Sequence, residues 1–446
     1  MWSNCMTRKS AKSLSRTASA AALVFLSFVG CREHGPQVED VAGGLDSAGE
    51  AVSESESGGL NIGRNLPVKP PMPAPCDVAI DPAQELMITD LSVVEDVERT
   101  KWTGDPEDMV SGAWNFGRLL TAMAGEQDPA EFATRWLQTW AHTTVVSGVE
   151  VPARVEMNTF LSQWPRLEDG TLDMARAPAR LLAIVNRTDL ADTTRAGEGR
   201  FIFGFTRDDA PLEFAVNLEY SLSLDVMSTE EWAAAWHALG DLELGTPAYN
   251  EALQEVTDAF TQVDTDGVPD TVPRRTDLAQ LRTNENEYGH GVWEMREFAA
   301  GADGFLAMQM LALTPAQALN GTVELRDFIN ENEAALLDGT YTIPLVYDDL
   351  AFQAAATRYS GVAWTTPPTV NNDARRALSL NTCDACHGAE TTTDFLHVQT
   401  REAGAESVLS GFLTGIDVVD PGDGVTIRHY ADLQRRSDAL AAVVCP

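Results

Sequence analysis

Apolar residues recur with two different periods along the chain. The helical period, with apolar side chains three or four residues apart, is found in five segments: residues 106–126, 128–142, 228–240, 246–263 and 322–339. Ser228 and Glu231 have the spacing of a capping box at a helix start. Gly240 and Gly339 stand where a helix would end. These segments therefore predict helices with defined starts and stops.

A second set of segments has the pattern of β-strands. Apolar and polar residues alternate, or apolar residues run together, at residues 180–190, 200–207, 212–224, 291–300 and 304–313. The strands follow one another at uneven distances and do not alternate regularly with helices. This order predicts an α+β fold with a mixed or antiparallel sheet, not a doubly wound parallel sheet.

The last hundred residues have a different character, with little strand pattern. Short helical and loop-like stretches dominate after residue 345. We therefore expect an α+β domain over residues 76–345, and a mostly helical or loop segment over 346–446.

The first thirty residues have the pattern of a signal peptide. Four basic residues and no acid precede an apolar run at residues 18–30, which is too short to cross a bilayer. Gly30 and Cys31 follow in the order found in bacterial lipoprotein signals. We predict a signal peptide over 1–30, lipidation of Cys31 and a lipid-anchored protein of the cell envelope, in the outer membrane. A short uncleaved anchor is the alternative.

The segment after Cys31 is polar and rich in Gly, Ser, Glu and Pro. Residues 31–75 show no periodic apolar face, so they cannot bury enough surface to offset the entropy of ordering. The sequence predicts a disordered tether that holds the folded body away from the membrane.

The net charge argues against two kinds of partner. With 31 basic and 67 acidic residues, the net charge is -36. Such a surface repels nucleic acid and anionic lipid headgroups. It suits either a saline habitat, where salt screens the self-repulsion, or simply an acidic envelope protein.

Four cysteines remain after Cys31: Cys76, Cys383, Cys386 and Cys445. An even number in an oxidising compartment favours pairing. Cys76 opens the folded body and Cys445 is the penultimate residue, so we predict a Cys76–Cys445 disulfide that joins the two ends. Cys383 and Cys386 are left to each other or to a cofactor.

The strongest chemical signal is Cys383-Asp384-Ala385-Cys386-His387, a C-x-x-C-H motif. In an exported bacterial protein this spacing is typical of covalent haem c attachment. The two thiols would bond to the porphyrin vinyl groups, and His387 would bind the iron. We therefore predict one haem c, with electron transfer to a redox partner protein.

The sixth iron ligand has few candidates. No methionine follows the motif, and Met308 and Met310 lie in an apolar strand pattern that indicates core positions. His397 is close to the motif in sequence and is our first choice, with His429 second.

Other uses of the motif stay open. Cys383 and Cys386 could form a plain disulfide or a redox dithiol, or could bind zinc with His387 and His397, His429 replacing one ligand. The protein would then be a non-redox structural or binding lipoprotein of the envelope.

A polar loop between two predicted strands is a further candidate site. It carries six charged or amide side chains: Asn186, Arg187, Asp189, Arg195, Glu198 and Arg200. The loop could line a pocket, but a structural corner held by salt bridges is the interpretation we favour.

Several stretches carry a resemblance: 379–398 with the motif, 406–415, 432–440, 181–190 and 197–205. In these the chain resembles uncharacterised bacterial envelope lipoproteins, of the kind abundant in myxobacteria. The resemblance implies an exported lipoprotein with one C-terminal C-x-x-C-H. It implies no catalytic activity and no substrate.

Overall fold

The computed structural model describes residues 78–105, 108, 111–155, 158–261, 278–286, 292–359, 361–368 and 371–445. All of them belong to one compact unit, which spans residues 59–446. The predicted signal peptide (1–30), lipidation site Cys31, tether (31–75) and Cys76 lie outside the described residues.

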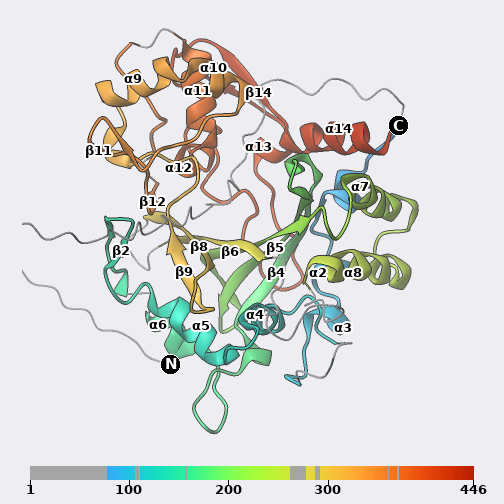
Figure 1. Ribbon diagram of the computed structural model, residues 1–446. Helices are drawn as coiled ribbons and strands as arrows, with labels where there is room; N and C mark the ends of the chain where they lie inside the picture. Colours follow the sequence, from blue (N-terminus) through green and yellow to red (C-terminus); the bar gives the residue numbers. More distant parts are fainter. Residues whose placement is uncertain are drawn as a thin grey trace, which may run out of the picture. The chain divides into compact units, whose positions relative to one another are not determined.

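One antiparallel sheet forms the centre of the described part (Figure 1). Its order is β1-β4-β5-β6-β7-β8-β12, and β9 pairs with β8. The strands are β1 (Met87–Ile88), β4 (Ala179–Arg187), β5 (Arg195–Arg207), β6 (Ala210–Ser223), β7 (Leu278–Asn286), β8 (Trp293–Ala300), β9 (Leu306–Gln309) and β12 (Thr357–Arg358). The sheet and its covering helices confirm the α+β class, in the antiparallel form.

In the described part of the chain, three short hairpins lie outside this sheet: β2 (Thr144–Val146) with β3 (Val149–Val151), β10 (Val346–Tyr347) with β11 (Leu350–Ala351), and β13 (Ile416–Val419) with β14 (Ile427–Tyr430). The α-helices are α1 (Pro82–Glu85), α2 (Leu91–Val94), α3 (Val97–Thr100), α4 (Phe116–Ala124), α5 (Pro129–Gln138), α6 (Asn158–Gln163), α7 (Thr229–His237), α8 (Pro247–Thr261), α9 (Val323–Glu331), α10 (Glu333–Asp338), α11 (Asn372–Asn381), α12 (Cys383–Cys386), α13 (Gly411–Thr414) and α14 (Asp432–Val444). The described residues also form four 3₁₀ turns: η2 (Met174–Arg176), η3 (Thr188–Leu190), η4 (Ala238–Asp241) and η5 (Gln317–Leu319).

The sheet has two different faces because successive side chains of a strand point to opposite sides. In β5, Phe201, Phe203 and Phe205 belong to the largest apolar core, which also contains residues of α4, α5, α7 and α8. Ile202 points the other way and packs with Phe412 and other residues of the C-terminal segment. The sheet is thus covered by helices on one face and by the C-terminal segment on the other.

The predicted boundary near residue 345 is a change of element type within one packed unit. A second apolar cluster contains Tyr341 and Ile343 from one side of this boundary, and Phe352, Trp364 and residues of α11 from the other. The C-terminal segment is therefore anchored both to this cluster and to the sheet.

The helix signals had mixed outcomes. The capping box of Ser228 and Glu231 is present at the start of α7, and Gly339 ends α10 with a left-handed φ of 71°. The prediction that Gly240 ends a helix is wrong, because α7 ends at His237 and Gly240 lies within η4. The predicted helix over 322–339 is divided at Asn332 into α9 and α10.

Candidate functional site

The C-x-x-C-H motif forms α12, a single helical turn directly after α11. A buried ion pair holds this turn: Arg375 of α11 donates to Glu390, beyond the motif, at 3.0 and 3.1 Å. The Ser379 hydroxyl also donates to Glu390, at 2.8 Å. Inside the motif, the Asp384 carboxylate accepts from the indole of Trp364 at 3.0 Å. These bonds hold the backbone around the motif in one arrangement.

Gly388, which follows the motif, lies where there is no room for a side chain. A Cβ on Gly388 would lie 2.5 Å from the Tyr359 ring and 2.6 Å from the Asp384 carbonyl oxygen. Any larger residue there would push the turn away from its neighbours.

His387 is oriented by a backbone carbonyl. Its Nδ1–H donates to the Phe395 oxygen at 2.5 Å, which leaves Nε2 as the unprotonated nitrogen. Burial lowers the pKa of His387 to about 4, so the ring is neutral near pH 7. A histidine that donates one ring nitrogen to a carbonyl and keeps the other free is arranged as metal-binding histidines usually are.

His397 lies beside His387, with 4.3 Å between the ring centroids. Its Nδ1 is hydrogen-bonded to the Ser410 hydroxyl at 2.8 Å, and its Nε2 is 3.6 Å from the Cys386 sulfur. Burial, with the nearby His387, lowers the pKa of His397 well below its usual range. The structure therefore brings together the motif and the histidine that we preferred as a second iron ligand.

The two motif cysteines are free thiols. Burial raises the pKa of Cys383 to about 11, and burial with the Asp432 charge raises that of Cys386 further. Both thiols are therefore protonated near neutral pH. Reactive dithiols of redox enzymes need a lowered pKa, so this environment does not favour the dithiol interpretation.

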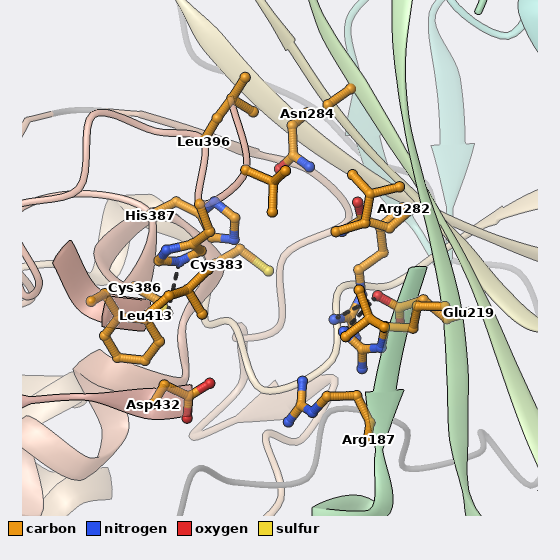
Figure 2. Close-up of a pocket in the computed structure, with 18 of the residues that line it drawn as sticks. Arg187, Glu219, Arg282, Asn284, Cys383, Cys386, His387, Leu396, Leu413 and Asp432 are labelled. Atoms are coloured by element: carbon orange, nitrogen blue, oxygen red, sulfur yellow. Dashed lines mark hydrogen bonds and ion pairs between the residues drawn. The ribbon is translucent and has the colours of Figure 1, made fainter. Parts of the chain in front are cut away.

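These groups line a cavity of about 190 Å³ between the C-terminal segment and the sheet. Figure 2 shows Cys383, Cys386 and His387 on one side, facing Arg282 and Glu219 on the other. Apolar side chains complete the walls: Met87, Val185, Leu190, Ile202, Ala215, Met295, Leu380, Leu396, Val398, Phe412 and Leu413.

The sheet wall of the cavity is a buried network of charges. Glu219 lies 3.1 Å from Arg200 and 3.7 Å from Arg282, and it accepts from Gln280 at 2.5 Å. Burial alone would raise the pKa of Glu219, but the two arginines hold it below its usual range. Glu219 therefore stays ionised.

The polar loop predicted at residues 186–200 contributes to this wall. Arg187 pairs with Asp189 at 2.8 Å, and Glu198 pairs with Arg195 and Arg200 at 2.9 and 2.6 Å. Arg187 ends β4, and Arg195, Glu198 and Arg200 belong to β5, so the strand ends and the turn between them form the salt-bridged corner that we favoured. Arg187 and Arg200 also line the cavity, so both interpretations of the loop hold.

The side of the cavity that carries the motif suits a haem better than the side that carries His397. The free thiols and the neutral, oriented His387 suit attachment on the motif side. Metal–imidazole bonds are about 2 Å long, so two axial nitrogens are about 4 Å apart and their ring centres further still. The 4.3 Å between the two ring centroids is therefore too short for both rings to bind one iron. The cavity is also smaller than the roughly 300–1,000 Å³ of ordinary ligand pockets, so His397 and its loop would have to move outward.

The geometry supports a zinc site less well than a haem site. Among the described residues, no three His, Cys, Asp or Glu side chains are arranged to hold a metal ion. His429, which we considered as a zinc or iron ligand, lies on β14, is largely exposed and pairs with Asp417 at 2.8 Å. It does not line the cavity.

The remaining sequence candidates lie apart from the motif. Met308 is buried in the large core, with Met310 packed against it, as predicted. Cys445 is disulfide-bonded. Its predicted partner Cys76 lies outside the described residues, so that pairing stays a prediction.

Sequence reasoning missed the part of the sheet wall that β7 contributes. Arg282 and Asn284 belong to β7, which was not predicted because its polar side chains obscure the strand pattern. The alternation of Gln280, Arg282 and Asn284 with Leu281 and Thr283 was the available signal.

Comparisons with protein-family models, curated proteins and solved structures found no match for this chain. The resemblance to bacterial envelope lipoproteins therefore stays a prediction. None of the helices in the described residues is both long and apolar enough to span a membrane.

Proposed function

We propose that this protein is an exported lipoprotein that carries one covalently bound haem c and exchanges electrons with a redox protein of the cell envelope. One observation carries the proposal. The C-x-x-C-H motif faces a cavity with two free thiols, and with a neutral His387 whose Nδ1–H is held by the Phe395 carbonyl.

Covalent attachment of the haem would involve only the two cysteine thiols and the two vinyl groups of the porphyrin. The Cys383 and Cys386 S–H groups would each add across one vinyl group, forming a C–S bond and passing the hydrogen to the neighbouring carbon. Nothing leaves, so the mass should rise by one intact haem. When bound, the iron would supply a one-electron couple.

His387 would hold one face of the iron through Nε2, since its Nδ1 is engaged by Phe395. His397, whose Nδ1 is hydrogen-bonded to the Ser410 hydroxyl, would be the second iron ligand. No methionine follows the motif, which favours bis-histidine ligation.

Coexpression with a cytochrome c maturation system tests the proposal. Haem should stay bound through denaturing electrophoresis, and the mass should rise by one haem. The double variant Cys383→Ala/Cys386→Ala should lose both signals. His397→Ala should keep the covalent haem but bind carbon monoxide at the open position, while His429→Ala serves as the exposed control and should bind none.

The alternatives give other results. One bound zinc without visible absorbance would favour a metal site, and a Cys383–Cys386 disulfide without haem or zinc would favour a structural role. Either result would replace electron transfer by a non-redox structural or binding role in the envelope.

The anchor is part of the proposal and has its own test. Cys31→Ser should move the protein from the membrane fraction to the soluble envelope fraction, because the lipid would be lost. A variant as firmly membrane-bound as the wild type would remove the lipidation proposal and leave the haem proposal untouched.

A further inference from the structure

The sheet wall of the cavity presents polar groups at one place on neighbouring strands. In the β6–β7 pair, Asn217 lies opposite Arg282, and Ala215 lies opposite Asn284. Arg282 and Asn284 are two residues apart on β7, so both point to the cavity side. In Figure 2 the Asn284 side chain lies near Leu396, and the Arg282 side chain extends toward Glu219 along the same wall of the cavity.

Asn284 has hydrogen-bonding capacity that the described residues do not use. The residue is only 2% exposed, and its Oδ1 is buried without a hydrogen-bond partner in the part of the chain that the structure describes. Buried amide groups are almost always hydrogen-bonded. Because the amide can rotate by half a turn, it can present either its oxygen or its NH₂ group to the same point.

Arg282 also has N–H groups that make no hydrogen bond to the described residues. Its Nε donates to Glu297 over a long 3.3 Å, and Nη1 is 3.7 Å from Glu219, beyond hydrogen-bond range. By contrast, Arg200 donates twice to Glu198, at 3.1 and 2.6 Å. A guanidinium has five N–H donors in a planar fork, so within the described residues Arg282 can still bind a further planar anion.

We propose that Arg282 and Asn284 form a carboxylate-binding site on the sheet wall of the cavity. The guanidinium would take the two carboxylate oxygens as a fork, and the Asn284 amide would donate to one of them. The carboxylate is either that of a free small acid or, if the proposed function holds, a propionate of the bound haem. A site for an anion is notable in a chain with a net charge of -36.

The first arm of the test uses the full chain produced without haem, titrated calorimetrically with succinate. If the ligand is a free acid, the wild type should bind succinate. Arg282→Gln and Asn284→Leu should each weaken binding about tenfold or more, as expected for loss of a hydrogen bond to a charged group. Arg282→Lys keeps the charge without the fork and should weaken it less than Arg282→Gln.

Arg195→Gln is the matched control. Arg195 is a buried arginine on β5 of the same sheet, paired with Glu198, and it does not line the cavity. It should leave succinate binding unchanged. Circular dichroism should confirm that each variant is folded before its binding is interpreted.

The second arm uses the haem-loaded protein. If the carboxylate is a propionate, Arg282→Gln should lower the midpoint potential more than Arg195→Gln does, because a positive charge beside the haem is lost. Covalent attachment, seen by haem staining, should persist in both, and the loaded wild type should not bind succinate.

The outcomes separate the two proposals. Haem staining that fails in every variant defeats the proposed function, while the succinate arm still decides the carboxylate site. If succinate binds neither form, and Arg282→Gln shifts the potential no more than Arg195→Gln, the site is wrong even when haem is attached.

Discussion

Asp384, between the two motif cysteines, is a buried carboxylate whose hydrogen bonds do not offset the effect of burial. Its Oδ1 accepts from the Trp364 indole, while its Oδ2 has no hydrogen-bond partner within the described residues. Burial raises the pKa of Asp384 from 3.8 to about 6, although the Trp364 bond acts in the opposite direction. The motif turn therefore contains a charge that the fold does not favour at neutral pH.

Asp384→Asn should stabilise the protein at high pH. Because the folded pKa lies above the unfolded value, the favourable contribution is complete below pH 3.8 and is lost as the pH rises through 6. Asparagine keeps the shape and stays neutral, so we expect a gain of up to about 3 kcal/mol at pH 8 and little at pH 4. Urea unfolding of both proteins at the two pH values measures this.

The exposed Asp394→Asn is the matched control for that measurement. It should change the free energy of unfolding by less than about 0.5 kcal/mol at either pH. A gain from Asp384→Asn that is equal at pH 4 and pH 8 would contradict the role of the buried charge.

At the scale of elements, α14 is held to the sheet by a buried ion network. Asp189 of η3 accepts from Arg187 at 2.8 and 2.9 Å and from Arg435 of α14 at 2.7 Å. Arg187 and Arg435, outweighing the effect of burial, hold the pKa of Asp189 well below its usual range. Asp432 pairs with both Arg435 and Arg436. One carboxylate thus joins the end of β4 to the C-terminal helix.

Asp189→Asn should loosen α14. Without the Asp189 charge, the buried side chains of Arg187 and Arg435 lose a neutralising partner. Breaking a buried ion pair in this way typically lowers the free energy of unfolding by about 3–5 kcal/mol. Hydrogen exchange should also speed up in α14 more than in β5. Asp438→Asn, on the same helix and bonded only to Gln434 among the described residues, is the control. A loss no greater than that of the control would mean that apolar packing alone holds the helix.

The sequence predicted those elements whose burial pattern is simple. β5 alternates phenylalanines with other residues, and its pattern could be read directly. β7 could not, because its cavity-facing residues are polar and its other face includes Thr283 and Glu285. The motif and His397 were found because haem attachment has a fixed spacing, whereas Arg282 and Asn284 join them only through strand pairing, which no local pattern records.

At the scale of the whole molecule, the two ends of the folded body are the predicted site of a covalent link. Cys445 is disulfide-bonded, and Cys76 is its predicted partner. Non-reducing peptide mapping should recover Cys76 joined to Cys445. Closing so long a loop should contribute about 6 kcal/mol in the chain-entropy model, so Cys76→Ser should lower the midpoint of urea unfolding. A free thiol at Cys76 in exported protein would overturn the pairing.

The net charge of -36 makes the stability of the whole molecule depend on salt. Like charges repel one another across the surface, and this repulsion favours the expanded, unfolded chain. Salt shortens the Debye length from about 10 Å at 0.1 M to about 3 Å at 1 M, which weakens the repulsion. Exposed ion pairs such as Arg135–Glu131 also weaken, but each is worth only about 0–1 kcal/mol.

Sodium chloride should therefore raise the melting temperature. Most of the gain should come below roughly 0.3 M, because screening changes most steeply there. A general salting-out effect on apolar burial would instead grow steadily with concentration, so the shape of the curve separates the two causes. Buried pairs such as Arg375–Glu390 are screened much less and should persist at high salt. A melting temperature that falls with salt would mean that surface ion pairs outweigh the net repulsion.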